Sequence, residues 1–119
     1  MNKQQEMQRY FDRSVEEILK QGRPCRGNSG NCRYRNSSNN TKCAIGHLIP
    51  DKKYKNEMEG FGISSLIIKD LVPSRWKRYE SFFVQLQRAH DNSSESNFVH
   101  DFEINAKRVA EKYNLEYKF

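Results

Sequence analysis

Three cysteines and a histidine, Cys25, Cys32, Cys43 and His47, lie close together in the sequence. Thiolate sulfur and imidazole nitrogen are the ligands that tetrahedral zinc prefers, and the Cys-x3-His interval would place the last two on one side of a helical turn. The spacing is therefore compatible with a Cys3His zinc site. No other cofactor is indicated by the sequence. The alternative is that Cys32 and Cys43 are buried as small apolar residues and that Cys25 is an exposed thiol.

A cysteine nucleophile is a second chemistry open to these residues. A thiolate forms at neutral pH only beside a base or a cation, and Cys43 has basic neighbours in the sequence. His90 or His47 could act as the base. In this hypothesis the protein is a Cys/His enzyme acting on a small ligand, with Cys43 and His90 as its catalytic residues. We favour binding without catalysis.

A localised positive charge is the third feature. Between Lys20 and Lys55 the chain has nine basic residues and one acid, Asp51, which gives this segment a net charge of +8 in a chain of +6. Such a segment attracts anions such as phosphates. Within it, Arg33-Tyr34-Arg35 interleaves cations with an aromatic ring, which suits phosphate binding and ring stacking. The alternative is a surface hairpin whose arginines pair with acidic residues of the first helix.

Three main helices should position these residues. Apolar residues at three-to-four spacing predict an amphipathic helix over residues 3–21, which ends at Gly22. Ser74 can cap a long helix that buries Trp76 and ends near His90, and a last helix follows the turn at residues 92–96. Shorter helical turns are expected over residues 51–62 and 63–71. The fold class is therefore mainly α, a single domain over residues 1–119.

A cysteine-containing irregular or hairpin segment is predicted at about residues 23–50. Its composition shifts to Gly, Asn, Ser and Arg. A short hairpin could pair residues 32–35 with 42–45 across the polar tip at 36–40. The run 43–49 is short and apolar, so that periodicity does not distinguish a strand from a buried helical turn.

Composition excludes several classes of protein. The chain has 119 residues, 35% of them hydrophobic, and a mean hydropathy of −1.01. It has no apolar window long enough for a membrane span and no signal-peptide pattern, so a cytoplasmic protein with reduced thiols is expected. No Gly-rich phosphate loop or paired-carboxylate motif indicates a nucleotide triphosphatase or a metallonuclease.

Several short motifs cover most of the chain in a fixed order. They include Cys32-Arg-Tyr-Arg35, Lys42-Cys-Ala-Ile-Gly46, Met58-Glu-Gly60 and Leu86-Gln-Arg-Ala-His-Asp91. These motifs resemble those of a family of small uncharacterised proteins of tailed phages and prophages. The resemblance implies a viral accessory protein in the host cytoplasm and supplies no activity. Members often have another residue at the position of His47 and lack a counterpart of Cys25, which weighs against zinc.

The residues that match these motifs are too polar for a helical core alone. They are Tyr34, Arg35, Cys43, Gly46, Tyr54, Glu59, Gly60, Gln87, His90 and Asp91. Such a set predicts either a buried polar network that fixes the loop onto the helices or a ligand pocket, and we favour the pocket. The candidate ligand-binding residues are Arg33, Tyr34, Arg35, Lys42, Tyr54, His90 and Asp91.

The leading functional hypothesis is sequestration of an anionic ligand. Phage accessory proteins often act against host immunity, and the ligand expected here is a small nucleotide signal of host defence. The alternatives are a nucleic-acid-binding protein, the Cys/His enzyme, and an inhibitor that docks on a host protein. A homo-oligomer is compatible with each of them.

Overall fold

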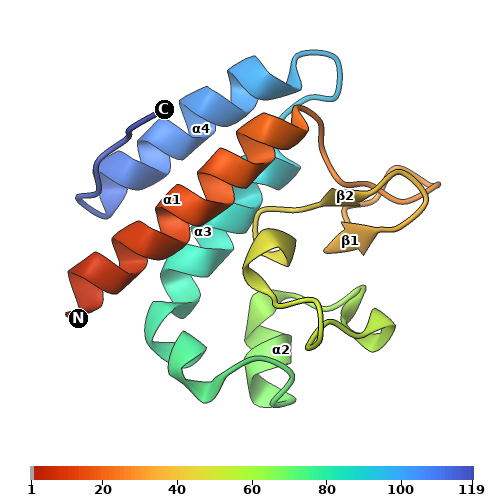
Figure 1. The fold of residues 1–119 in the computed structure, drawn as a ribbon, viewed down its shortest axis with the longest axis horizontal. Coiled ribbons are helices and arrows are strands. Elements are labelled where there is room, and N and C mark those ends of the chain that lie inside the picture. Colours follow the sequence, from red (N-terminus) through yellow and green to blue (C-terminus); the bar gives the residue numbers. More distant parts are fainter. Residues whose placement is uncertain (1) are drawn as a thin grey trace.

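Three main helices lie side by side and form one half of the molecule (Figure 1). The structure, a computed structural model, describes residues 2–119. The helices are α1 (Lys3–Gln21), α3 (Glu80–Asp91) and α4 (Phe98–Lys112). The antiparallel helices α3 and α4 make the most extensive contact, and α1 packs against both. The structure thus confirms the mainly α fold with three main helices.

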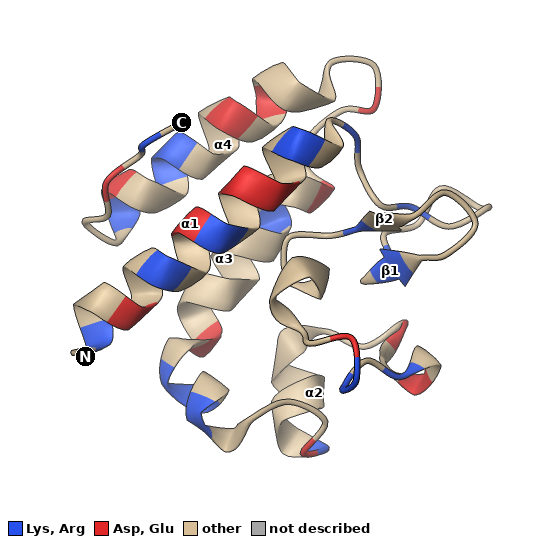
Figure 2. Cartoon of the chain, viewed as in Figure 1, with Lys and Arg blue, Asp and Glu red and all other residues tan. Residues whose placement is uncertain are grey.

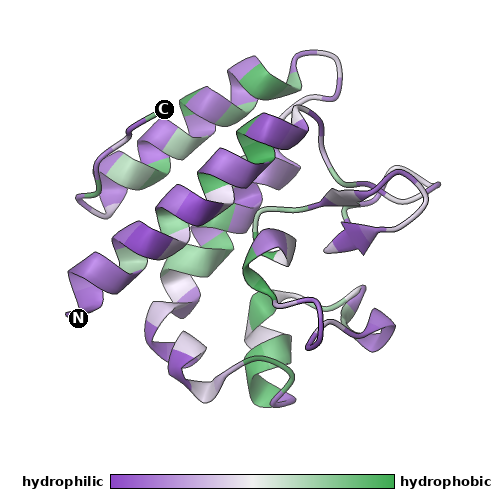
Figure 3. Ribbon diagram, in the orientation of Figure 1, coloured by the Kyte–Doolittle hydropathy of each residue, from purple (hydrophilic) through white to green (hydrophobic). Residues whose placement is uncertain are grey.

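The first helix has clear start and stop signals. The side chain of Asn2 accepts a hydrogen bond from the backbone of Gln5, whose own side chain accepts one from the backbone of Asn2, forming a capping box. Gly22 ends the helix in the left-handed conformation, at φ 72°, and its N–H bonds to the Ile18 carbonyl. One apolar face is buried, while the hydrophilic residues face the viewer in Figure 3. The expected helix over 3–21 is confirmed.

The helix expected from Ser74 divides in two. Residues Ser74–Tyr79 form a 3-10 helix, in which Ser74 makes no side-chain cap, and α3 begins only at Glu80. In a 3-10 helix, residues three apart share one face. Trp76 and Tyr79 are accordingly both buried, and both rings pack edge-on against Tyr10 of α1. The predicted burial of Trp76 is confirmed.

The irregular half contains a hairpin smaller than expected. Strand β1 (Arg35–Asn36) pairs antiparallel with β2 (Thr41–Lys42), with Arg35 opposite Lys42. The Cys43 N–H still donates to the Tyr34 carbonyl at 3.0 Å, but the backbone groups beyond it bond to helices. The Ala44 carbonyl accepts from Ser14 of α1, at 2.8 Å, and the Ile45 N–H donates to Gln87 of α3, at 3.1 Å. Tertiary hydrogen bonds therefore replace the expected pairing of residues 44 and 45.

The remaining elements are short. They are the 3-10 turns Gly46–Leu48 and Asn56–Met58 and the helix α2 (Ile63–Ile68). The first of these turns settles the ambiguous run 43–49 as a helical turn rather than a strand. After α4 the chain turns back and hydrogen-bonds to Gln8 and Asp12 of α1, where the ring of Tyr117 packs edge-on against Phe11. Within residues 2–119, no helix has the length and apolar character to cross a membrane.

Candidate anion-binding site

A polar pocket of about 400 Å³ lies beside the hairpin. Four of the predicted ligand-binding residues line it: Arg33, Arg35, Lys42 and Tyr54. Each hairpin strand carries a basic residue (Figure 2), and the register places Arg35 opposite Lys42 so that the two cations face the same space. The rest of the lining is polar, including Asn, Ser and Thr side chains and Asp51. We name this cavity the arginine pocket.

One carboxylate bridges two cations in the arginine pocket. Oδ1 of Asp51 lies 2.8 Å from Nη1 of Arg35 and 3.3 Å from Nζ of Lys42. The hydrogen bond and charge of Lys42, followed by those of Arg35, lower the pKa of Asp51 below its ordinary value. The Asp51 side chain is 83% exposed, whereas that of Arg35 is only 15% exposed. An exposed carboxylate thus caps a largely buried guanidinium.

The Arg35 guanidinium is held in place from three sides. Nη2 donates to the Ile49 carbonyl, Nη1 meets Asp51, and the ring centroid of Tyr54 lies 4.8 Å from the guanidinium carbon. Its Nε is buried and has no hydrogen-bond partner. Buried polar groups in proteins are almost always satisfied, so this unpartnered donor is an exception.

Glu59 fixes the backbone of the Arg-Tyr-Arg motif. Its two carboxylate oxygens accept the N–H groups of Tyr34, at 2.9 Å, and Arg35, at 3.1 Å. The Tyr54 hydroxyl also donates to it, and Arg33 lies 3.8 Å away. The Arg33 and Arg35 side chains therefore project from a backbone clamped by a buried charge. The expected alternative, in which these arginines pair with the first helix, is not what the structure shows.

The other three predicted ligand residues lie outside the arginine pocket. Tyr34 is 6% exposed, and its hydroxyl donates to the Phe61 carbonyl at 2.6 Å. His90 is fully buried. Tyr34 and Asp91 instead line a neighbouring cavity of about 500 Å³, named here the central hollow. The predicted site is therefore split, because burial in the core takes Tyr34 and His90 away from the basic surface.

The four predicted zinc ligands do not meet. Across residues 2–119, the one group of three or more candidate ligand side chains close enough to share a metal is Cys32, His90 and Asp91. Three of the predicted four make separate local hydrogen bonds: Cys25 to the Thr41 carbonyl, Cys43 from the Gly46 N–H, and His47 to the Gln21 side chain. In this structure the four side chains of the expected Cys3His site therefore do not lie close enough together to share a metal ion.

The cluster that does form, Cys32, His90 and Asp91, does not suit a cation. The backbone N–H of Cys25 donates to Nε2 of His90 at 3.0 Å, and Nδ1 of His90 lies 2.8 Å from Oδ1 of Asp91. A neutral imidazole in this position carries its hydrogen on Nδ1 and has no lone pair left for a metal. The Arg26 guanidinium, 2.9 Å from the Cys32 sulfur, adds a positive charge. Burial and then Asp91 raise the pKa of Cys32 to about 11.

The Cys43–His90 pair is equally unsuited to catalysis. Cys43 is fully buried, and burial raises the pKa of its thiol, so that the reactive thiolate is disfavoured. Both ring nitrogens of His90 are already engaged. The basic residues near Cys43 in the sequence point into the arginine pocket rather than toward its sulfur. This geometry opposes the hypothesis of a Cys/His enzyme built on these two residues.

Three motif residues of α3, Gln87, His90 and Asp91, form a polar network with the loop. Gln87 accepts the Ile45 N–H and donates to Asp91, at 2.9 Å, while His90 joins the Cys25 backbone to Asp91. Burial alone would raise the pKa of Asp91, but hydrogen bonds from His90, Cys32 and Gln87 keep it below its ordinary value. The interpretation as a buried polar network therefore applies to Glu59, Gln87 and His90. The interpretation as a ligand pocket applies to Arg35 and Tyr54.

His47 should make stability depend on pH. Burial, followed by the charge of Lys42, lowers the pKa of His47 to about 4, well below its value of about 6.5 in an unfolded chain. Below pH 6.5 the unfolded state therefore binds a proton that the folded state does not, and stability falls as the pH drops from about 6.5 to 4. Urea unfolding should show a flatter pH dependence for His47→Gln, which can still donate to Gln21, than for the parent. The exposed His100→Gln is the control, and equal slopes in all three proteins would contradict the prediction.

No family model, curated protein or solved structure matches this chain. The likeness of the motifs to phage proteins therefore remains a prediction from sequence. Inference about function rests on the arginine pocket and the cavities beside it.

Proposed function

We propose that this protein binds a small phosphate-bearing ligand, a nucleotide, in the arginine pocket. The observation that carries the proposal is the Asp51 carboxylate held between Arg35 and Lys42. It marks the point where the protein stabilises an oxyanion. Because Asp51 is exposed and makes its ion pairs only through Oδ1, a phosphate can displace it without breaking the core.

Sequestration is the mode of action that we propose. The cysteine and histidine best placed by sequence for chemistry, Cys43 and His90, are buried and engaged, whereas the arginine pocket offers donors and an aromatic edge. Together with the resemblance to phage proteins, this supports a phage accessory protein with an anti-defence role, which would withdraw a nucleotide signal of the host immune response.

The proposal can be tested by calorimetric titration with inorganic phosphate and a panel of linear and cyclic nucleotides. Lys42→Ala should weaken binding of the best ligand by about ten- to a hundredfold, since a hydrogen bond to a charged group contributes about 1.5–3 kcal/mol. Asp51→Asn should tighten binding, because it removes the competing carboxylate.

The matched control is Lys52→Ala, which removes the same charge from an exposed residue outside the arginine pocket. It should change affinity less than twofold at about 0.15 M salt, where distant surface charges are screened. If the two lysine variants weaken binding equally, or if no nucleotide binds the parent, the proposal is wrong.

A further inference from the structure

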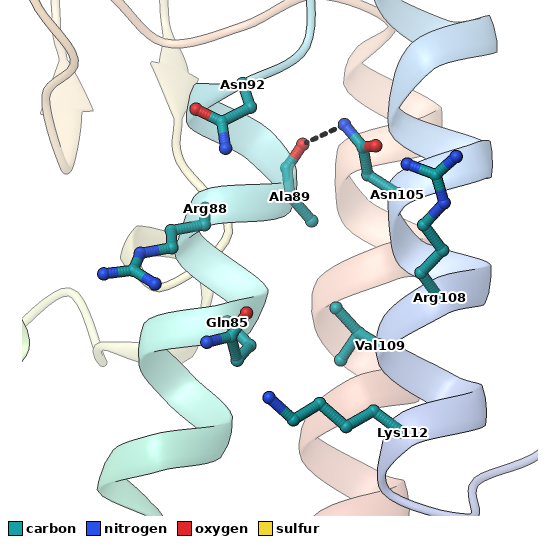
Figure 4. A pocket seen from close by; sticks show the side chains of 8 residues that line it. All are labelled: Gln85, Arg88, Ala89, Asn92, Asn105, Arg108, Val109 and Lys112. Carbon is teal, nitrogen blue, oxygen red and sulfur yellow. Dashed lines mark hydrogen bonds between the residues drawn. The ribbon is translucent and has the colours of Figure 1, made fainter.

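A groove of about 370 Å³ runs between α3 and α4. Residues 85, 88 and 89 of α3 and the C-cap residue Asn92 line one wall, and residues 105, 108, 109 and 112 of α4 line the other, so each helix presents one face (Figure 4). Asn105 joins the two walls by donating to the Ala89 carbonyl at 3.3 Å. In Figure 4, Lys112 extends across the space toward Gln85. We name this feature the α3–α4 groove.

The α3–α4 groove is basic and has no acidic lining residue. Its cations are Arg88, Arg108 and Lys112. Within the part of the chain that the structure describes, none of them forms a salt bridge. Arg108 and Lys112 are four residues apart on one helix, a spacing at which like charges repel. An anion bound from outside would relieve that repulsion.

Shared arginines connect the groove to the proposed nucleotide site. Arg88 lines both the α3–α4 groove and the central hollow, and Arg33 lines both the central hollow and the arginine pocket. The three cavities therefore follow one another across the surface. The two outer cavities contain most of the cations, with Asp51 as the one carboxylate among them, whereas the central hollow has two carboxylates, Glu59 and Asp91.

The central hollow also has an aromatic side chain at the surface. Phe61 lines it and is 43% exposed, and the ammonium of Lys69 lies 4.7 Å from its ring centroid. An exposed ring can stack on a base. The Asp91 carboxylate can accept a hydrogen bond from a base N–H group, such as an exocyclic amino group or the N3–H of thymine, but would repel a phosphate or another carboxylate.

We infer that the three cavities form one site for a single-stranded oligonucleotide. Phosphates lie in the arginine pocket and in the α3–α4 groove, and a base lies between them in the central hollow against Phe61. The inference rests on the proposed function for the arginine pocket and extends its ligand from one nucleotide to several. An acidic peptide fits less well, because Asp91 would repel its carboxylates and it has no base to stack on Phe61.

The first test compares ligands by fluorescence anisotropy competition over a range of salt concentrations. A labelled thymidine oligomer of about eight nucleotides, within the usual range for single-strand sites, should bind at least tenfold more tightly than thymidine monophosphate. Poly-glutamate of equal charge should compete poorly. If poly-glutamate competes as well as the oligomer, the surface recognises polyanions or acidic proteins in general, and the inference is overturned.

The second test compares two double variants of equal charge. Arg108→Ala/Lys112→Ala should weaken oligomer binding by more than tenfold and reduce the salt slope by about 1.4, since each phosphate contact on a single strand contributes about 0.7. It should leave thymidine monophosphate binding unchanged. The control, Lys77→Ala/Arg78→Ala, removes one lysine and one arginine from exposed positions outside the three cavities and should have little effect.

The outcomes separate this inference from the proposed function. If Lys42→Ala weakens the oligomer but Arg108→Ala/Lys112→Ala does not, the arginine pocket alone binds the ligand and the inference fails. If both variants weaken the oligomer while mononucleotides fail to bind, the extended site stands and sequestration of a small nucleotide is wrong. Circular dichroism melts of each variant, expected to match the parent, show that lost binding does not reflect unfolding.

Discussion

Replacing Gly46 by alanine is expected to destabilise the protein by about 3 kcal/mol or more, at the upper end of the range for overpacking. A Cβ at this position would overlap the backbone carbonyl oxygen of Tyr34. That carbonyl cannot easily move, because it accepts the Cys43 N–H at 3.0 Å and belongs to a backbone clamped by Glu59. Urea unfolding of Gly46→Ala should show a much lower midpoint, or no cooperative transition.

Gly62→Ala is the matched control for this substitution. A Cβ at Gly62 would meet no atom within 4 Å, and its φ of −75° is ordinary for alanine. Restricting the unfolded chain should even stabilise the protein slightly, by about 0.4–1 kcal/mol. If both alanine variants unfold at the same urea concentration, then the close approach of Gly46 to Tyr34 does not limit stability.

The second large effect is expected for Glu59→Gln. The side chain keeps its size, but an amide has one acceptor oxygen where the carboxylate presents two to the Tyr34 and Arg35 N–H groups and the Tyr54 hydroxyl. In either orientation the amide NH₂ faces a donor. Leaving buried donors unpaired should cost about 2–4 kcal/mol of unfolding free energy. Denaturant unfolding of the purified variant measures it.

Glu57→Gln makes the same chemical change two residues earlier on an exposed side chain. It should alter stability by less than about 0.5 kcal/mol. Anion binding gives a second measurement, because the clamp on the Arg33–Arg35 backbone orients both arginines. Glu59→Gln should therefore also weaken nucleotide binding at temperatures where it remains folded. An unfolding free energy equal to that of the parent would refute the role assigned to Glu59.

Local patterns in the sequence were sufficient for the helices and for part of the site. The apolar spacing of α1, the burial of Trp76 and the pairing of Arg35 with Lys42 each follow from residues near in the chain. Charge is also a local property, so the basic segment indicated the arginine pocket before any fold was known. The capping signal at Ser74 was misleading, because packing of Trp76 and Tyr79 against Tyr10 favours a 3-10 helix there.

Only the tertiary structure decided which polar residues meet. Glu59 and Gln87 are distant in sequence from the loop groups that they bind, and no periodicity indicates such partners. From the sequence, Cys43 and His90 were candidates for a reactive pair. Their burial and the hydrogen bond from the Cys25 backbone to His90 make them unreactive, and both arise only in the assembled fold. The α3–α4 groove was missed for the same reason. Its cations are unremarkable on each helix alone and become a site only where two helix faces lie together.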